Sequence, residues 1–113
     1  MLISEVSKTM DISADTLRYY EKIGLIPDVK RNKSGIRDYS EDDLMWIQFA
    51  KCMRSAGLSI EVLTEYLKLF KEGDSTLEVR KDILVEERSK LINKISDIQS
   101  TLERLDYKIS NYE

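Results

Sequence analysis

After Gly73 this 113-residue chain contains no further glycine or proline, the residues that most often interrupt a helix. Within that stretch apolar residues recur at alternating steps of four and three, which is the a/d seam of a heptad repeat. The seam consists of Leu91, Ile95, Ile98, Leu102, Leu105, Ile109 and Tyr112. This pattern predicts one helix over residues 76–112, opened by a capping box at residues 75–78. A helix of that length needs a partner along its seam, most simply a second copy, although packing along the chain's own helices is the alternative.

The composition excludes most catalytic and metal chemistry. The chain has no His and one Cys, so His-based triads, multi-thiol metal clusters and an intramolecular disulfide are ruled out. It has no apolar run long enough to cross a membrane and no signal-peptide pattern at its start. We therefore expect a cytoplasmic protein that is not an enzyme, uses no metal or other cofactor and does not enter a membrane. A thiol-dependent enzyme is the weakest alternative, because no His could serve as its base.

Two short helices near the start form a predicted helix-turn-helix. Residues 4–10 and 14–23 have helical spacing of apolar residues, and the break between them is only three residues long. Asp11 tolerates the left-handed conformation that such a tight turn often needs. Ser13 is placed to cap the second helix, and Gly24 followed by Pro27 ends it. This order of elements is typical of DNA-binding modules.

The second helix has a polar face that suits DNA. Asp15, Arg18, Tyr19 and Lys22 recur at helical spacing, and the guanidinium, phenol and ammonium groups of the last three offer donors for phosphates and base edges. The whole chain has a net charge of −3, but residues 16–37 carry six Lys or Arg against two acidic residues, a local charge of +4. An ordinary solvated helix face is the alternative. A local basic face allows an acidic protein to bind DNA.

The remaining segments complete a mainly helical fold. Residues 29–31 and 36–39 are β-prone arms around an Asn/Ser/Gly turn, which predicts a basic β-hairpin. Helices are predicted over residues 41–56, capped by Ser40, and 60–71, capped by Ser59. The sequence therefore predicts an all-α fold with a small β-hairpin wing, in which a winged helix-turn-helix precedes a long C-terminal helix.

The single Cys has two interpretations. Cys52 lies on a helical stripe with Met45, Phe49 and Ala56, so it could be a small core residue. Alternatively, its thiol could be a reactive sensor, although no cation of its own helix faces it. Several aromatic residues could likewise form either core or a small-ligand pocket: Trp46, Phe49, Tyr66, Tyr107 and Tyr112.

Three segments resemble the MerR family of transcription regulators. Residues 16–27 (TLRYYEKIGLIP) resemble its recognition-helix motif, residues 35–44 (GIRDYSEDDL) its wing and following helix, and residues 53–60 (MRSAGLSI) its second helix-turn-helix junction. The final heptad helix fits the dimerisation helix of that family. Two residues depart from the common pattern, Asp11 where Gly is usual and Ile36 where Tyr is usual.

The resemblance implies a homodimer joined by an antiparallel coiled coil. Residues 1–73 would form the winged DNA-binding domain with its second helix pair, and residues 74–113 the dimerisation helix through Leu91, Ile95, Ile98, Leu102, Leu105 and Ile109. Such dimers bind a pseudo-palindrome in double-stranded promoter DNA, distort its overlong spacer and thereby act indirectly on RNA polymerase as activators. The positions that match DNA contacts of the family are Thr16, Arg18, Tyr19 and Lys22 on the helix and Arg31, Arg37 and Tyr39 on the wing.

The resemblance also suggests a signal. Residues 34–39 and 51–59 resemble the subgroup that responds to reactive aldehydes or thiol-modifying stress, in which the Cys matching Cys52 is the sensing thiol. One alternative is a related regulator that senses a non-covalent small ligand. Another, of a different class, is a coiled-coil adaptor that binds a protein partner and no DNA.

Overall fold

The structure is a computed structural model that describes residues 1–112. Its helices are α1 (Ile3–Met10), α2 (Ala14–Ile23), α3 (Glu41–Ser55), α4 (Ile60–Lys71), the 3-10 helix η1 (Asp74–Thr76) and α5 (Leu77–Ser110). The first four begin and end within one residue of their predicted bounds, which confirms those predictions. The chain divides into two compact units, Met1–Arg80 and Lys81–Glu113, and each is described by itself. Within residues 1–112, no helix combines the length and apolarity that crossing a membrane requires.

The helix-turn-helix forms for the local reasons that the sequence provides. Asp11 ends α1 in the left-handed conformation at φ 52°, as predicted. The Ser13 side chain accepts a hydrogen bond from the backbone N–H of Thr16 at 3.1 Å and so caps α2. Gly24 ends α2 at φ 82°, a conformation that glycine adopts without steric cost. The two helices pack directly on each other.

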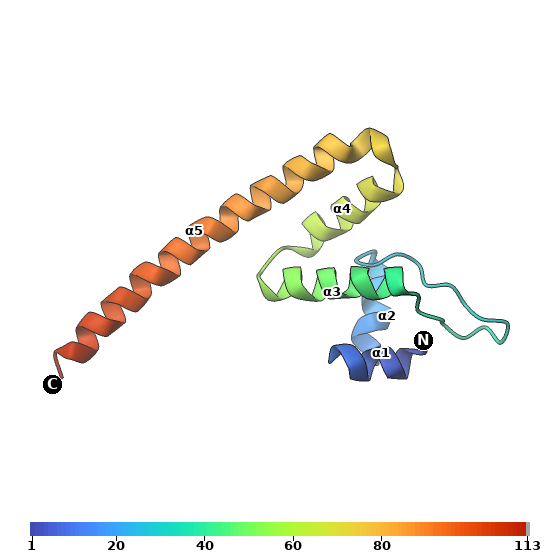
Figure 1. Cartoon of the computed structure of the whole chain (residues 1–113), viewed down its shortest axis with the longest axis horizontal. Helices are drawn as coiled ribbons and strands as arrows, with labels where there is room; N and C mark the ends of the chain where they lie inside the picture. The colour runs from blue at the N-terminus through green and yellow to red at the C-terminus, as the bar shows by residue number, and fades with distance from the viewer. Residues whose placement is uncertain (113) are drawn as a thin grey trace. The chain divides into compact units, whose positions relative to one another are not determined.

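The core of the first unit lies where α1, α2 and α3 meet the loop between α2 and α3 (Figure 1). Its buried members are Val6, Leu17, Ile26, Val29, Tyr39, Ile47 and Ala50. The Lys51 ammonium of α3 also donates a hydrogen bond to the carbonyl of Met10, in the last turn of α1. Helix α3 therefore supports the helix-turn-helix through both apolar packing and a polar contact.

The segment predicted as a β-hairpin is a loop that folds back on itself. In Figure 1 it is the long excursion between α2 and α3. It contains one isolated antiparallel bridge, between Arg31 and Arg37, and no named strand occurs among residues 1–112. The Asn32 side chain builds its tip by accepting hydrogen bonds from the N–H groups of Ser34 and Ile36, at 2.9 and 3.1 Å. The hairpin strands are thus not confirmed, although the chain reverses where the turn was predicted.

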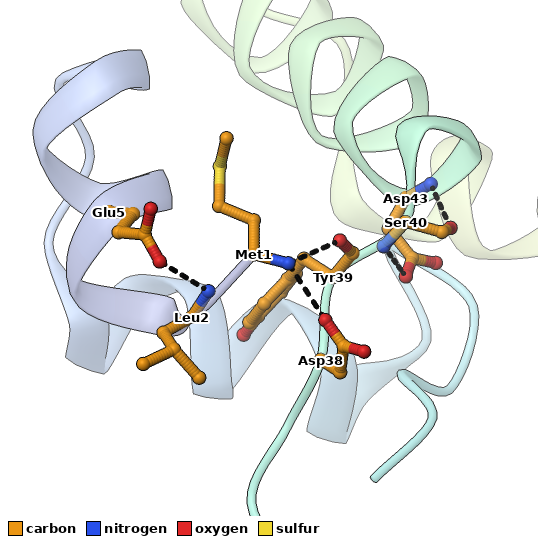
Figure 2. A network of polar contacts seen from close by, with 7 residues as sticks. All are labelled: Met1, Leu2, Glu5, Asp38, Tyr39, Ser40 and Asp43. Atoms are coloured by element: carbon orange, nitrogen blue, oxygen red, sulfur yellow. Dashed lines mark hydrogen bonds and ion pairs between the residues drawn. The ribbon is translucent and has the colours of Figure 1, made fainter. Parts of the chain in front are cut away.

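A polar network connects the start of the chain to the start of α3 (Figure 2). The Met1 ammonium lies 2.7 Å from a carboxylate oxygen of Asp38, and the N–H of Tyr39 donates to the Met1 carbonyl at 2.7 Å. Ser40 and Asp43 then cap each other's backbone N–H groups at 3.1 and 2.9 Å, which is a capping box. These contacts hold the end of the α2–α3 loop against α1.

Helix α4 packs on α3 through aromatic rings. The Trp46 and Phe70 centroids are 5.0 Å apart, and those of Phe49 and Tyr66 are 5.8 Å apart. The helix predicted over residues 76–112 is found as α5 (Leu77–Ser110), which begins within one residue of the predicted start and follows directly on η1. The Thr76 hydroxyl donates to backbone carbonyls, including that of Leu69 at 2.6 Å.

Candidate nucleic-acid interface

The outer face of α2 presents the side chains that the sequence predicts for DNA contact. Arg18 and Lys22 are exposed, and half of the Tyr19 surface is exposed. The opposite face of the helix is anchored by Leu17, which is fully buried. Because Leu17 fixes the rotation of α2, this polar face is held outward. The arrangement suits a helix that enters a major groove.

Two of the predicted helix residues already have partners within α2. The Arg18 guanidinium pairs with the Asp15 carboxylate at 2.9 Å, although Asp15 is 96% exposed and screened by solvent. The Thr16 hydroxyl shares a hydrogen bond with the Ser13 hydroxyl at 2.7 Å, so Thr16 also belongs to the cap. Lys22 takes part in no ion pair among the residues that the structure describes. The Arg18–Asp15 pair holds the guanidinium in position while leaving it open to a stronger anion.

The α2–α3 loop adds two more of the predicted basic residues. Arg31 is exposed and donates to the Gly35 carbonyl at 2.8 Å, which closes the tip of the loop. Arg37 is less exposed and pairs through its Nε with a carboxylate oxygen of Glu21 at 2.8 Å. The loop therefore places Arg37 beside α2, the helix that presents Arg18 and Lys22.

Tyr39 is placed differently from the other predicted contacts. It is a core residue with 3% of its surface exposed. Its hydroxyl is buried and has no hydrogen-bond partner among residues 1–112. Burial raises the pKa of Tyr39, and the nearby Arg37 cation offsets part of that rise. This hydroxyl cannot reach a DNA phosphate unless the loop above it moves.

Cys52 is exposed on α3. It borders a hollow of about 420 Å³ whose lining residues are Gln48, Lys51, Cys52, Ser55 and Ala56. The basic residues adjacent in sequence are both engaged elsewhere, because Lys51 donates to the Met10 carbonyl and Arg54 to the Leu58 carbonyl. The thiol is thus accessible to a small molecule, and its exposure does not fit the alternative of a core residue.

Three of the aromatic residues considered for a ligand pocket lie together in the first unit. Trp46, Phe49 and Tyr66 meet at a hollow of about 180 Å³, which Met45 also lines. Tyr107 and Tyr112 belong to the second unit and are 71% and 83% exposed. Among the described residues, no cluster of three or more His, Cys, Asp or Glu side chains could hold a metal ion.

The seam of α5 lies open in the single chain. Five of its predicted dimerisation residues are exposed by 47–65%, and these are Ile95, Ile98, Leu102, Leu105 and Ile109. Leu91 is partly exposed. A continuous row of large apolar side chains on one helix is typical of a surface that another helix covers.

Sequence reasoning missed one residue of the site, Glu21. It lies on α2, and its carboxylate accepts hydrogen bonds from both Arg37 and the N–H of Val29. The sequence does contain one indication of Glu21. It and Asp28 are the only acidic residues between positions 16 and 37, in an otherwise basic segment. No local pattern connects Glu21 to Arg37, which lies sixteen residues further along the chain.

Comparison with known proteins places these features in a family. Residues 1–69 match the family described as MerR HTH family regulatory protein. AdhR, an HTH-type transcriptional regulator of Bacillus subtilis, is 62% identical over 92 residues, which cover 81% of this chain and 66% of AdhR. The chain thus spans slightly less than two thirds of that relative.

Two solved structures extend the similarity to the fold. A MerR family transcriptional regulator from Listeria monocytogenes has a TM-score of 0.96 and 53% identity, covering 99% of this chain and 85% of its own. HiNmlR, a MerR family regulator that lacks the sensor domain and is bound to promoter DNA, has a TM-score of 0.87 and 31% identity, covering 98% and 88%. These relatives are regulators and not enzymes, as expected for this chain. The resemblance seen in the sequence is confirmed, and the chain belongs to the MerR family of helix-turn-helix regulatory proteins.

Proposed function

We propose that this regulator binds a pseudo-palindromic promoter as a homodimer, distorts the spacer DNA and thereby activates transcription by RNA polymerase. The observation that carries the proposal is that the exposed polar face of α2 lies next to the basic α2–α3 loop. In this proposal the loop acts as the wing. The DNA-bound state of HiNmlR, which shares the fold at 31% identity, supports it. Residues 1–73 form the DNA-binding part in this proposal, and residues 74–113 form the dimerisation helix.

The proposal assigns roles to the basic residues by their position. Arg18 and Tyr19 contact bases from α2, with Thr16 beside them, because they project from the middle of the exposed face. Lys22 and the loop residues Arg31 and Arg37 hold phosphates in this proposal, because their charged groups flank the base-contacting face. Tyr39 supports the loop from the core, since its hydroxyl is buried.

Substitution of Arg18 tests the DNA contact. We expect Arg18→Ala to weaken binding to the promoter fragment by about thirtyfold or more, since each of the two copies in the proposed dimer would lose a base-reading arginine worth about 1–3 kcal/mol. Fluorescence anisotropy with DNA from upstream of the regulator's own gene measures this. Arg104→Ala removes the same charge from an exposed position on α5 and should leave binding unchanged. Equal affinities for wild type and Arg18→Ala would remove the assignment.

Dimerisation follows from the seam on α5. A second copy would cover the exposed residues from Ile95 to Ile109, and the antiparallel arrangement is carried over from the family resemblance. The two copies would bind two half-sites related by the same twofold symmetry.

We further propose that the signal is a reactive aldehyde or a related thiol-modifying stress that acts on Cys52. The exposed thiol and the hollow beside it support this, as do the subgroup resemblance and the 62% identity with AdhR. The thiolate sulfur would form a bond to the carbonyl carbon, the C=O π bond would break, and the oxygen would take up a proton. Because Lys51 and Arg54 are engaged by carbonyls, the cation that favours the thiolate would come from the second copy.

Replacement of the thiol tests the sensing role. Cys52→Ser should keep its DNA affinity and lose the response of promoter activity to aldehyde. Ser55→Ala, which changes the same hollow but keeps the thiol, should respond normally. Intact mass measured under non-denaturing conditions should increase for wild type after treatment and stay constant for Cys52→Ser. A normal induction curve for Cys52→Ser would refute covalent sensing.

One observation favours a second candidate. The hollow lined by Met45, Trp46, Phe49 and Tyr66 is apolar and could take a small unreactive ligand. Induction without any mass change, abolished by Phe49→Ala and retained by Cys52→Ser, would favour this ligand-sensing alternative.

A further inference from the structure

Glu21 is an acidic residue at the centre of a basic surface. Its side chain is 14% exposed, and both carboxylate oxygens are used. Oε1 accepts a hydrogen bond from Nε of Arg37 at 2.8 Å, and Oε2 accepts one from the backbone N–H of Val29 at 3.3 Å. A single carboxylate on the recognition helix therefore contacts the loop at two points.

The two contacts lie on opposite arms of the loop. Val29 precedes the bridge between Arg31 and Arg37, and Arg37 forms its far side. Fixing both arms to one carboxylate restricts the loop to one position against α2. The short charge-assisted bond at Nε also fixes the plane of the Arg37 guanidinium, whose terminal nitrogens take no part in that bond.

We propose that Glu21 is a positioning residue for DNA recognition, which sets the spacing between the face of α2 and the phosphate-binding Arg37. This inference rests on the proposed function, because it assigns Glu21 a role in promoter binding. Simultaneous contact with a major groove and the neighbouring backbone requires a fixed distance between the two protein elements.

Charge alone leads to the opposite expectation. Glu21 places a negative charge on a surface that faces phosphates, so its removal would strengthen binding to every DNA sequence. If Glu21 positions Arg37, its removal weakens binding to the promoter, while affinity for unrelated DNA stays constant or rises. The ratio of the two affinities therefore separates positioning from simple repulsion.

The experiment compares Glu21→Gln with wild type on a promoter fragment and on a scrambled fragment of equal length, over a series of salt concentrations. Asp28→Asn is the matched control, because it removes one charge from an exposed position in the same loop. We expect Glu21→Gln to lower the specific-to-nonspecific ratio about tenfold or more, and Asp28→Asn to leave it unchanged. Partial unfolding would lower both affinities in proportion and so would not change the ratio.

The salt dependence and a double variant complete the test. If Arg37 no longer meets its phosphate in either copy of the proposed dimer, two phosphate contacts are lost, and the slope of log affinity against log salt should become shallower by about 1.8 in Glu21→Gln. The Glu21→Gln and Arg37→Gln double variant should then lose no more specific affinity than Arg37→Gln alone.

The outcomes distinguish the inference from the function on which it rests. A wild-type protein that binds both fragments equally would overturn the proposed function and the inference together. A selective wild type with an unchanged or raised ratio in Glu21→Gln would overturn the inference alone, as would additive losses in the double variant.

Discussion

Replacing Tyr39 by Phe should stabilise the protein. The Tyr39 ring is 97% buried in the core, and its hydroxyl has no hydrogen-bond partner among residues 1–112. A buried polar group without a partner costs about 1–3 kcal/mol relative to a paired one. Phe keeps the ring and removes only that oxygen, so we expect the free energy of unfolding to rise by about 1–3 kcal/mol.

Urea unfolding at equal protein concentrations measures this change. Tyr19→Phe is the matched control, because the Tyr19 side chain is 50% exposed and its hydroxyl can bind water in both folded and unfolded chains. We expect that control to change the free energy of unfolding by less than about 0.5 kcal/mol.

The difference between wild type and Tyr39→Phe should widen in alkali. Burial raises the pKa of Tyr39 above the usual tyrosine value of about 10, so the unfolded chain loses this proton first. Relative to the ionised form, which is costlier to bury, the neutral form keeps wild type at its full stability below pH 10, and that stability falls as pH rises through the folded-state pKa. Phe carries no such proton, so only wild type suffers this loss.

Two results would refute the reasoning. A loss of stability in Tyr39→Phe greater than about 1 kcal/mol would mean that the hydroxyl has a partner, such as a bound water. A constant difference between the two proteins from pH 8 to pH 11 would mean that the hydroxyl is not desolvated.

Three further substitutions test other features of the fold. Asp11→Val should lower the free energy of unfolding by about 1–2 kcal/mol, because a β-branched residue is strained at φ 52°, whereas Asp11→Gly should be neutral or stabilising in the same urea assay. Ser40→Ala should cost about 0.5–2 kcal/mol by removing the cap on α3, and a change below 0.3 kcal/mol in thermal unfolding would contradict that role. Ile98→Asp should make the chain monomeric in sedimentation experiments if the proposed dimer forms along the seam, since burying a charge there opposes association, whereas Ser100→Asp, which lies off the seam, should sediment like wild type.

The predicted elements that were confirmed depend on local signals. Ser13, Gly24 and Ser40 each act within a few residues of their own position, so the helix ends could be placed from the sequence. The start of α5 at Leu77 lies one residue after the predicted start at residue 76, so this helix could also be placed from the sequence. The bond from the Thr76 hydroxyl to the Leu69 carbonyl of α4 could not, because no local pattern indicates it.

The features that sequence reasoning missed depend on distant contacts. The bond between Glu21 and Arg37 joins residues sixteen positions apart. Alternation along a strand predicts that Arg37 and Tyr39 lie on the same face, so it could not indicate that Tyr39 is buried while Arg37 pairs with α2. The arms of the loop pair only at the bridge between Arg31 and Arg37, while Val29 and Tyr39 at their outer ends pack in the core. Cys52 could not be assigned from its stripe, because α3 packs through Ile47 and Ala50 and leaves Cys52 exposed.

The contact between Lys51 and the Met10 carbonyl bears on how new binding specificities could be built. The end of α1, where the chain enters the turn toward α2, is held from α3, about forty residues further along the chain. A chimera that transplants only the first two helices into a related regulator would leave this support behind. Exchanging residues 1–58 as one block would carry the brace together with the helix that it steadies, and such a graft should keep its donor's operator preference.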